Sequence, residues 1–411
     1  MSEVLVINSG SSSLKYAVIE ATTGARVTAG LVERIGEAES TVNHSSVDNL
    51  AARSFPAHVR DHDEAFACVL ERLAEAGLDR PAAVGHRVVH GGDRFTQPAL
   101  IDADVRSAIV ACVPLAPLHN PPCLSGIDAA VKALPDVPQV AVFDTAFHTT
   151  IPEPARTYAI DREVAREHRL QRYGFHGTSH EYVGRRAADL LGMPFAECDL
   201  ITLHLGNGAS ACAIRHGRSI ETSMGVTPLE GLVMGTRSGD IDPSIPEILG
   251  RAGWSAAEVD TMLNRRSGLL GLCGDNDLRE VHARAESGDE RAALARDVYA
   301  HRIRKYVGAY LIVLGGADAL VFTAGVGEHD AWMRQAVCRG LDRFGISVDP
   351  ELNAAGPGAA GTGSRRISPL GTPTPVLVIP TDEEHAIAEQ TAGLLGLATG
   401  FTSSRRPAAP H

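Results

Sequence analysis

One β-hairpin pattern occurs twice in this sequence, about two hundred residues apart, and this repeat restricts the fold more than any other feature. Residues 4–7 and 14–19 are apolar strands that flank a loop of Asn, Ser and Gly. Residues 200–205 and 211–214 flank a similar Gly-Asn-Gly loop, and a second turn follows at His216-Gly217. Two copies at this separation predict a duplicated domain.

Helices and strands alternate through the rest of the chain. Helical periodicity at 63–76, 181–191 and 289–314 is interrupted by short apolar strands such as 319–322. Alternation of this kind predicts an α/β fold whose sheets are covered by helices.

Two Pro-containing turns divide the chain. The turn at 150–154 and the turn at 379–381 are the expected crossing points between domains. We therefore predict an N-terminal domain made of residues 1–150 and 383–411, and a second domain made of residues 151–382.

Charge composition excludes one class of partner. The 411 residues include 38 Lys and Arg against 50 Asp and Glu, a formal charge of −12, and no basic run is present. Nucleic acid is not an expected partner, because a phosphate backbone requires a basic surface. An anionic substrate must instead be bound by a few well-placed cations.

The expected location is the cytoplasm. The N-terminus has no basic segment before its short apolar run, and no segment approaches the roughly 18 apolar residues of a membrane span. The seven cysteines form no CxxC pair and are odd in number, which indicates reduced thiols.

Small polar loops in both hairpins are suited to phosphate, because backbone N–H groups reach an anion without obstruction. Lys15 adds a cation beside the first loop. A third candidate loop, Gly325-Val326-Gly327-Glu328, follows the strand at 319–322. It lacks the third glycine of a dinucleotide fingerprint, since residue 330 is Asp, and no GxxxxGK[ST] motif occurs. The remaining possibility is a nucleotide site built from the two hairpins and one Gly-rich strand end.

Two arginines and one histidine lie in glycine-rich segments. Arg87 and Arg237 have small neighbours that leave a guanidinium open to a carboxylate or a phosphate. His176 precedes a helix for which Thr178 and Glu181 predict a capping box. An imidazole at a positive helix end suits a developing negative charge.

Two carboxylates are candidates for binding Mg²⁺. Asp144 follows the strand at 140–143, and Glu383 follows Thr381-Asp382. A second predicted capping box, Thr381 with Glu384, gives Glu384 a structural role and leaves Glu383 available. Either acid could hold the ion directly or through its water shell.

Taken together, these segments resemble the acetate kinase family from about residue 4 to about residue 395. The segments that carry the resemblance are Asn8-Ser9-Gly10-Ser11-Ser12-Ser13-Leu14-Lys15, Gly85-His86-Arg87-Val88-Val89-His90-Gly91-Gly92, Pro117-Leu118-His119-Asn120-Pro121, Phe143-Asp144-Thr145-Ala146-Phe147-His148, residues 173–180, His204-Leu205-Gly206-Asn207-Gly208, Arg237-Ser238-Gly239-Asp240 and residues 380–384.

The resemblance implies the acetate and sugar kinase, heat-shock chaperone and actin fold: two ribonuclease H-like domains around a nucleotide cleft, as a homodimer. It also implies roles for individual residues. Asp144, His176 and Arg237 are catalytic, and Asn8 and Glu383 bind Mg²⁺ or Mn²⁺. The acid is bound by Arg87, Val89, Leu118, Phe175 and Pro228. ATP is bound by Lys15, His204, Leu205, Gly206, Asn207, Gly208, Asp277, Leu278, Arg279, Gly325, Val326, Gly327, Glu328 and His329.

Three positions depart from the family pattern. His329 and Cys123 stand where Asn is usual, and Asp382 replaces a common Asn. His329 puts one polar contact to the nucleotide in doubt, and Asp382 adds charge beside the predicted metal ligand.

The predicted reaction is direct in-line phosphoryl transfer from ATP to acetate. A carboxylate is already ionised at neutral pH, so Asp144 is expected to orient an arginine or Mg²⁺ water rather than to remove a proton. A propionate or butyrate kinase is the nearest alternative. An ATPase of the same fold that has no acid substrate is the alternative from another class, and the incomplete glycine fingerprint disfavours a dehydrogenase.

Overall fold

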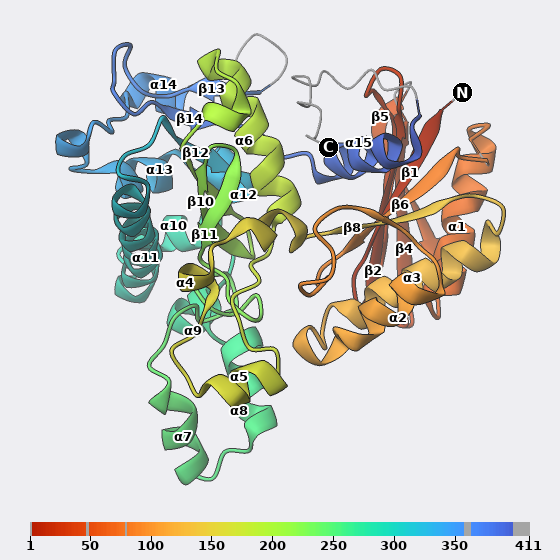
Figure 1. Cartoon of the computed structure of the whole chain (residues 1–411), viewed down its shortest axis with the longest axis horizontal. Coiled ribbons are helices and arrows are strands. Elements are labelled where there is room, and N and C mark those ends of the chain that lie inside the picture. The colour runs from red at the N-terminus through yellow and green to blue at the C-terminus, as the bar shows by residue number, and fades with distance from the viewer. Residues whose placement is uncertain (1, 47–48, 79, 357–362, 398–411) are drawn as a thin grey trace. The chain divides into compact units, whose positions relative to one another are not determined.

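The computed structural model describes residues 2–46, 49–78, 80–356 and 363–397. The chain forms two compact units, each with its own sheet. Unit 1 comprises Met1–Thr149 and Asp382–His411, and unit 2 comprises Thr150–Thr381. The termini are labelled in Figure 1.

Unit 1 contains an eight-stranded sheet with the order β5-β4-β3-β2-β1-β6-β8-β7. Its strands are β1 (Glu3–Ser9), β2 (Ser13–Glu20), β3 (Arg26–Glu33), β4 (Ser40–Ser46), β5 (Asn49–Ala57), β6 (Ala83–Val88), β7 (Ala99–Leu100) and β8 (Gln139–Phe143). Its helices are α1 (His62–Glu75), α2 (Ala103–Ala111), η1 (Val113–Leu115), α3 (Asn120–Ala133) and α15 (Glu383–Leu395), and η2 (Ala146–Thr150) ends at the boundary.

The alternation of side chains along β1 explains why helices cover both faces of this sheet. Leu5 and Ile7 belong to an apolar cluster with residues of α1 and α3. Val4 and Val6 belong to a second cluster with Ile387 and its neighbours on α15. Successive strand residues point to opposite faces, so an all-apolar strand needs a helix layer on each side.

Unit 2 contains a six-stranded sheet with the order β11-β10-β9-β12-β14-β13. Its strands are β9 (Leu200–Leu205), β10 (Ala209–Arg215), β11 (Arg218–Thr222), β12 (Ala319–Thr323), β13 (Arg365–Arg366) and β14 (Val376–Val378). Its helices are α4 (Glu153–Arg156), α5 (Arg162–Glu167), α6 (Gly177–Leu191), η3 (Phe195–Glu197), α7 (Ser244–Arg251), α8 (Ala256–Arg265), α9 (Gly268–Cys273), α10 (Leu278–Glu286), α11 (Glu290–Leu314), α12 (Ala324–His329), α13 (Ala331–Cys338), η4 (Asp342–Phe344) and α14 (Pro350–Ala354).

The two sheets share one topology. In unit 1, β1, β2 and β3 pair antiparallel in sequence, and β6 and β8 then continue from β1 as parallel strands. In unit 2, β9, β10 and β11 pair antiparallel, and β12 and β14 continue from β9 as parallel strands. Figure 1 shows the sheet of unit 2 between α6 and α11. The repeated order confirms the predicted duplication and the α/β fold.

Both capping boxes predicted from the sequence are wrong. Helix α6 begins at Gly177, because His176 adopts a left-handed conformation (φ 55°) and turns the chain into the helix two residues before Thr178. Helix α15 is capped by Asp382, whose side chain accepts a hydrogen bond from the His385 amide. Glu384 is thereby released from capping.

All seven cysteines are free thiols, as the sequence indicated. Within the described part of the chain, no helix is both long enough and apolar enough to span a membrane.

Candidate active site

Unit 1 places Arg87 and Asp144 side by side at the ends of two parallel strands. Arg87 lies on β6, in register with Val142 on β8, and Asp144 directly follows β8. The guanidinium donates to both carboxylate oxygens of Asp144, with Nη2 2.7 Å from Oδ2 and Nε 3.1 Å from Oδ1. A second carboxylate, Glu383, lies 3.5 Å from Nη1. Three residues that the sequence singled out separately, Arg87, Asp144 and Glu383, thus lie together in unit 1.

Burial and charge act against each other in this group. Asp144 is 2% exposed, and burial raises the pKa of its carboxyl, while the Arg87 charge opposes that change. Burial also works against the Arg87 charge, but Asp144 and Glu383 raise its pKa above the ordinary value. Nearby Cys123 is a neutral thiol, because burial raises its pKa to about 11. Two carboxylates thus hold one permanently charged guanidinium.

The first hairpin and the start of α15 form one charged surface in unit 1. Asn8 pairs with Lys15 across β1 and β2, and the Lys15 ammonium lies 2.5 Å from Glu384, the residue after Glu383. Asp382 binds Arg26 at 2.7 Å, so a partner offsets the charge that this substitution adds. Lys15 is thus paired within unit 1, and a role for it at a nucleotide remains a proposal.

Unit 2 places His176 in a cluster of imidazoles and hydroxyls. The His176 ring stacks on the His204 ring with centroids 4.1 Å apart. Its Nδ1 lies 2.9 Å from the Ser210 hydroxyl, which also contacts His180 Nε2 at 2.8 Å. His204 in turn contacts the Ser179 hydroxyl at 2.8 Å. This network fixes the orientation of the His176 ring.

Arg237 lies beside the same ring. A methyl group added at Gly208 would lie 3.0 Å from Arg237 Nη2 and 3.6 Å from the His176 ring, so the second Gly-rich loop passes directly over both. The guanidinium donates to the Pro228 carbonyl at 2.6 Å. Burial lowers the pKa of Arg237, and the described residues give it no carboxylate partner. A desolvated cation of this kind favours an incoming anion.

A pocket of about 690 Å³ in unit 2 is lined by most of the predicted nucleotide residues. The predicted residues that line it are Gly206, Asn207, Asp277, Leu278, Arg279, Gly325, Val326 and His329. The lining residues that sequence reasoning missed are Gly235, Leu269, Asn276, His282, Asp330 and Ala331. Helical spacing could have found His282, which lies one turn after Leu278 on α10.

The remaining predicted nucleotide residues of unit 2 do not line this pocket, and two of them, His204 and Gly208, lie beside the His176 ring. Leu205 is buried in β9, and Gly327 packs against the backbone of Phe322. The Glu328 carboxylate accepts a hydrogen bond from the Thr381 amide at 3.1 Å. The buried Arg334 donates to the carbonyls of Gly327 and Glu328 at 3.0 and 2.9 Å and so fixes the Gly-rich turn.

The predicted acid-binding residues are divided between the two units. Val89 and Leu118 belong to unit 1, together with Arg87. Phe175 and Pro228 belong to unit 2, where Phe175 is buried beside His176 in sequence and Pro228 holds Arg237. A common pocket formed by these four side chains therefore remains a proposal.

The available side chains decide whether the site could bind a magnesium ion. In the described part of the chain, no group of three or more His, Cys, Asp or Glu side chains is arranged to hold a metal. Mg²⁺ commonly keeps several waters and takes one or two carboxylates plus phosphate oxygens. Asn8, Asp144 and Glu383 match that sparse set, which suits an ion that arrives with a nucleotide.

Comparison with known proteins places the chain in a family. Residues 3–389 match the Acetokinase family. The chain is 55% identical to an acetate kinase of Streptomyces avermitilis over 404 residues, which covers 97% of this chain and 99% of that protein.

Solved structures agree with this match. A Porphyromonas gingivalis acetate kinase superposes with a TM-score of 0.90 at 41% identity, and a Francisella tularensis propionate kinase superposes with a TM-score of 0.89 at 42% identity. In each case the match covers 96% of this chain and 100% of the other. The chain belongs to the acetokinase family.

Proposed function

We propose that this protein is an acetate kinase that transfers the γ-phosphoryl group of ATP to acetate, reversibly and in line. An acetate oxygen forms a bond to the γ-phosphorus, the bond from that phosphorus to the β–γ bridging oxygen breaks, and acetyl phosphate and ADP are the products. The similarity to proteins named acetate kinase supports the choice of acid. The observation that carries the mechanism is Arg237, a desolvated cation beside a nucleotide-sized pocket.

Each half of the reaction has its own residues in this proposal. Arg87, held by Asp144, binds the acetate carboxylate. Arg237 and His176 face the transferring phosphoryl group, where negative charge builds up in the transition state. The pocket of unit 2 takes the nucleotide. Mg²⁺, held through Asn8 and Glu383, would supply charge neutralisation on the phosphate oxygens.

No general base is needed in this scheme, because acetate is ionised at neutral pH. Asp144 is engaged with Arg87 through both carboxylate oxygens. We therefore assign it the task of orienting Arg87, and its negative charge near Glu383 also favours a hydrated Mg²⁺ there.

The direct test is an acid panel with Mg-ATP and hydroxylamine, which converts an acyl phosphate into a hydroxamate. Formate, acetate, propionate and butyrate are compared with a reaction that lacks any acid. Hydroxamate that is highest with acetate supports the proposal. ATP consumption that is the same without acid would instead identify an ATPase.

A propionate kinase is the second candidate, because the solved propionate kinase resembles this chain as closely as the solved acetate kinase does. The same panel separates the two. A kcat/KM for propionate above that for acetate would replace our proposal.

We also propose a homodimer in the cytoplasm. Leu294 and Ile312 of α11 are 59% and 79% exposed, and their spacing of 18 residues, five helical turns, places them on one face. Burial of two such side chains between two copies of the chain would contribute to association. Light scattering of the purified protein tests the assembly.

A further inference from the structure

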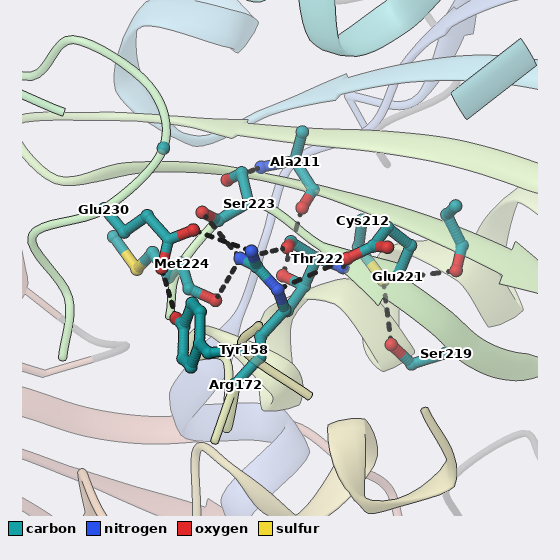
Figure 2. Close-up of polar contacts among 12 residues, drawn as sticks. Tyr158, Arg172, Ala211, Cys212, Ser219, Glu221, Thr222, Ser223, Met224 and Glu230 are labelled. Carbon is teal, nitrogen blue, oxygen red and sulfur yellow. Dashed lines mark hydrogen bonds and ion pairs between the residues drawn. The ribbon is translucent and has the colours of Figure 1, made fainter. Parts of the chain in front are cut away.

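Arg172, an arginine outside the predicted site, is mostly shielded from solvent, with 16% of its side chain exposed, and contacts the segment that leads to Arg237. It precedes His176 by four residues. Its Nη1 lies within hydrogen-bond distance of three successive carbonyls, those of Thr222, Ser223 and Met224, at 3.0, 3.3 and 3.2 Å. Figure 2 shows the guanidinium enclosed by these groups. One side chain therefore fixes the chain where β11 ends.

The other edge of the guanidinium holds the far end of the same loop. Arg172 Nη2 donates to Glu230 Oε1 at 2.6 Å, and Tyr158 donates to the second oxygen of Glu230. Glu221 lies 3.5 Å from Nε. Although burial opposes the charge, Glu230, Tyr158 and Glu221 raise the pKa of Arg172, so it remains charged.

The loop between these two anchors carries Pro228, whose carbonyl accepts the hydrogen bond from Arg237. The loop also contacts the His176 segment directly, because the amides of Tyr173 and Gly174 lie 3.1 and 3.3 Å from the Gly225 carbonyl. A side chain at Gly225 would overlap the Glu230 carboxylate and the Tyr158 hydroxyl. The loop is thus tied at its start, middle and end.

The segment from this loop to Arg237 is closed by a second set of bonds. The Gly231 amide donates to Asp240 Oδ1 at 2.9 Å, and the Asp240 amide donates to the Gly231 carbonyl at 3.0 Å. Gly231 directly follows Glu230. A shift of Glu230 would therefore move both the Pro228 carbonyl and the base of the loop that carries Arg237.

From these contacts we infer that Arg172 is a positioning residue for phosphoryl transfer, acting through Pro228 and Glu230 on Arg237 and through the backbone at Gly225 on His176. The inference rests on the proposed function. Arg172 touches no substrate in this scheme. Its effect is on the geometry of the groups that do, and a displacement of about 1 Å at such groups can reduce turnover about 100-fold.

Arg172→Lys is the primary test, because a lysine keeps the charge but cannot bind three carbonyls and a carboxylate in one plane. Arg304 offers a matched control. Its Nη1 also donates to three carbonyls, those of Ala336, Val337 and Arg339, and none of these residues belongs to the loop that carries Arg237. We expect Arg172→Lys to lower kcat about 10- to 100-fold with an ATP KM within about twofold of wild type. Arg304→Lys should keep its kcat.

A double variant separates positioning from general loss of stability. In an Arg237→Ala background, Arg172→Lys should lower kcat by much less than it does alone, because its target is already absent. Multiplicative losses, or equal kcat values for Arg172→Lys and Arg304→Lys, would overturn the inference. Should Arg172→Lys fail to fold, Glu230→Gln is judged by the same criteria, since it keeps the shape of the side chain and removes its charge.

Hydrogen exchange tests the inference without any turnover. Amides in residues 223–231 should exchange faster in Arg172→Lys and not in Arg304→Lys. Unchanged exchange of these amides in Arg172→Lys would contradict the positioning role of Arg172. Failure of the wild-type chain to make an acyl phosphate would contradict the proposed function alone, because the exchange result does not depend on it.

Discussion

Arg87 and Arg237 are both shielded guanidinium groups assigned to substrates, but their surroundings differ in charge. Arg87 in unit 1 is bound by Asp144 and approached by Glu383. Arg237 in unit 2 has a carbonyl partner, Pro228, and no carboxylate among the described residues. Its pKa is lowered by burial, whereas that of Arg87 is raised.

This difference suits the two proposed substrates. A cation already balanced by carboxylates binds a singly charged acid weakly and mainly orients it. A cation that is desolvated and unbalanced gains most when charge develops on the phosphoryl oxygens. The contrast predicts that loss of Arg237 affects the transition state, and that loss of Arg87 affects both the acid site and the fold.

The largest expected effect is that of Arg237→Ala. We expect kcat to fall by roughly 10³-fold or more, since an arginine at a transferring phosphoryl group is worth that much. The ATP KM should change little, because the nucleotide pocket is lined by other residues. Steady-state kinetics measures both. His176→Ala is the companion variant and should lose less, because it removes no permanent charge. A change confined to the ATP KM would refute the assignment of Arg237.

Arg87→Gln should destabilise the protein, because it leaves the buried Asp144 carboxylate without its partner. Breaking a buried ion pair on one side costs about 3–5 kcal/mol. Urea unfolding measures this loss. Adding Asp144→Asn should restore much of the stability but not the activity. Arg237→Ala is the matched control and should unfold near the wild-type urea concentration, since it orphans no carboxylate. Equal destabilisation by Arg87→Gln and Arg237→Ala would contradict the proposed difference in charge surroundings between the two arginines.

Acid should weaken unit 1 through His86, which neighbours Arg87 on β6. Burial lowers the pKa of His86 to about 4, so its neutral form is the folded one. Protonation of His86 therefore does not affect the free energy of unfolding above about pH 6.5. As the pH falls towards 4, the free energy of unfolding decreases by up to roughly 3 kcal/mol. Unfolding free energies measured across this window test the sign. His86→Gln should flatten the pH dependence, and a variant with the wild-type slope would exclude His86 as its source.

Asp144→Asn and Glu383→Ala should each raise the Mg²⁺ concentration needed for half-maximal rate, by a factor of about 10, if these acids act through a hydrated ion. Titration of Mg²⁺ at fixed ATP gives this value, and repeating it with Mn²⁺ checks that the effect is general. An unchanged metal requirement in both variants would return the two acids to a purely structural role around Arg87.

Val89→Ala should give the smallest effect. One methylene in an apolar pocket is worth about 1–3 kcal/mol at most, so propionate is expected to be a poorer substrate and not an excluded one. Removing two methyl groups should raise the propionate-to-acetate ratio of kcat/KM several-fold and leave the ATP KM unchanged. If that ratio stays constant or moves towards acetate, Val89 does not line the acid pocket.

Much of the fold was readable from the sequence because its signals are local. The two hairpins are contiguous segments, so their sequence patterns predict them directly. The Arg87–Asp144 contact joins residues 57 positions apart, and the sequence singled out both side chains but not their pairing. Charge balance around Arg237 could not be read in this way. It depends on which residues surround the guanidinium in space. These include Gly208, Pro228 and His176, which are far from one another in the sequence.

The errors have the same physical origin. A capping box at Thr178 satisfies local chemistry, but the left-handed backbone at His176 starts α6 earlier. The sequence predicts a helix-capping role for Glu384, but its carboxylate instead forms an ion pair with Lys15, which is remote in sequence. Arg172 has no local sequence signal, because its partners on β11 and in the following loop lie about fifty residues away.

The most direct test of the central claim follows the oxygen atom that attacks phosphorus. Acetate labelled with ¹⁸O in both carboxylate oxygens is incubated with the protein and Mg-ATP, and the product is examined by ³¹P NMR. Direct transfer to the carboxylate predicts acetyl phosphate whose phosphorus signal carries the isotope shift of one bridging ¹⁸O. If the only phosphorus product beside ADP is unlabelled inorganic phosphate, formed at the same rate without acetate, the protein does not phosphorylate this acid.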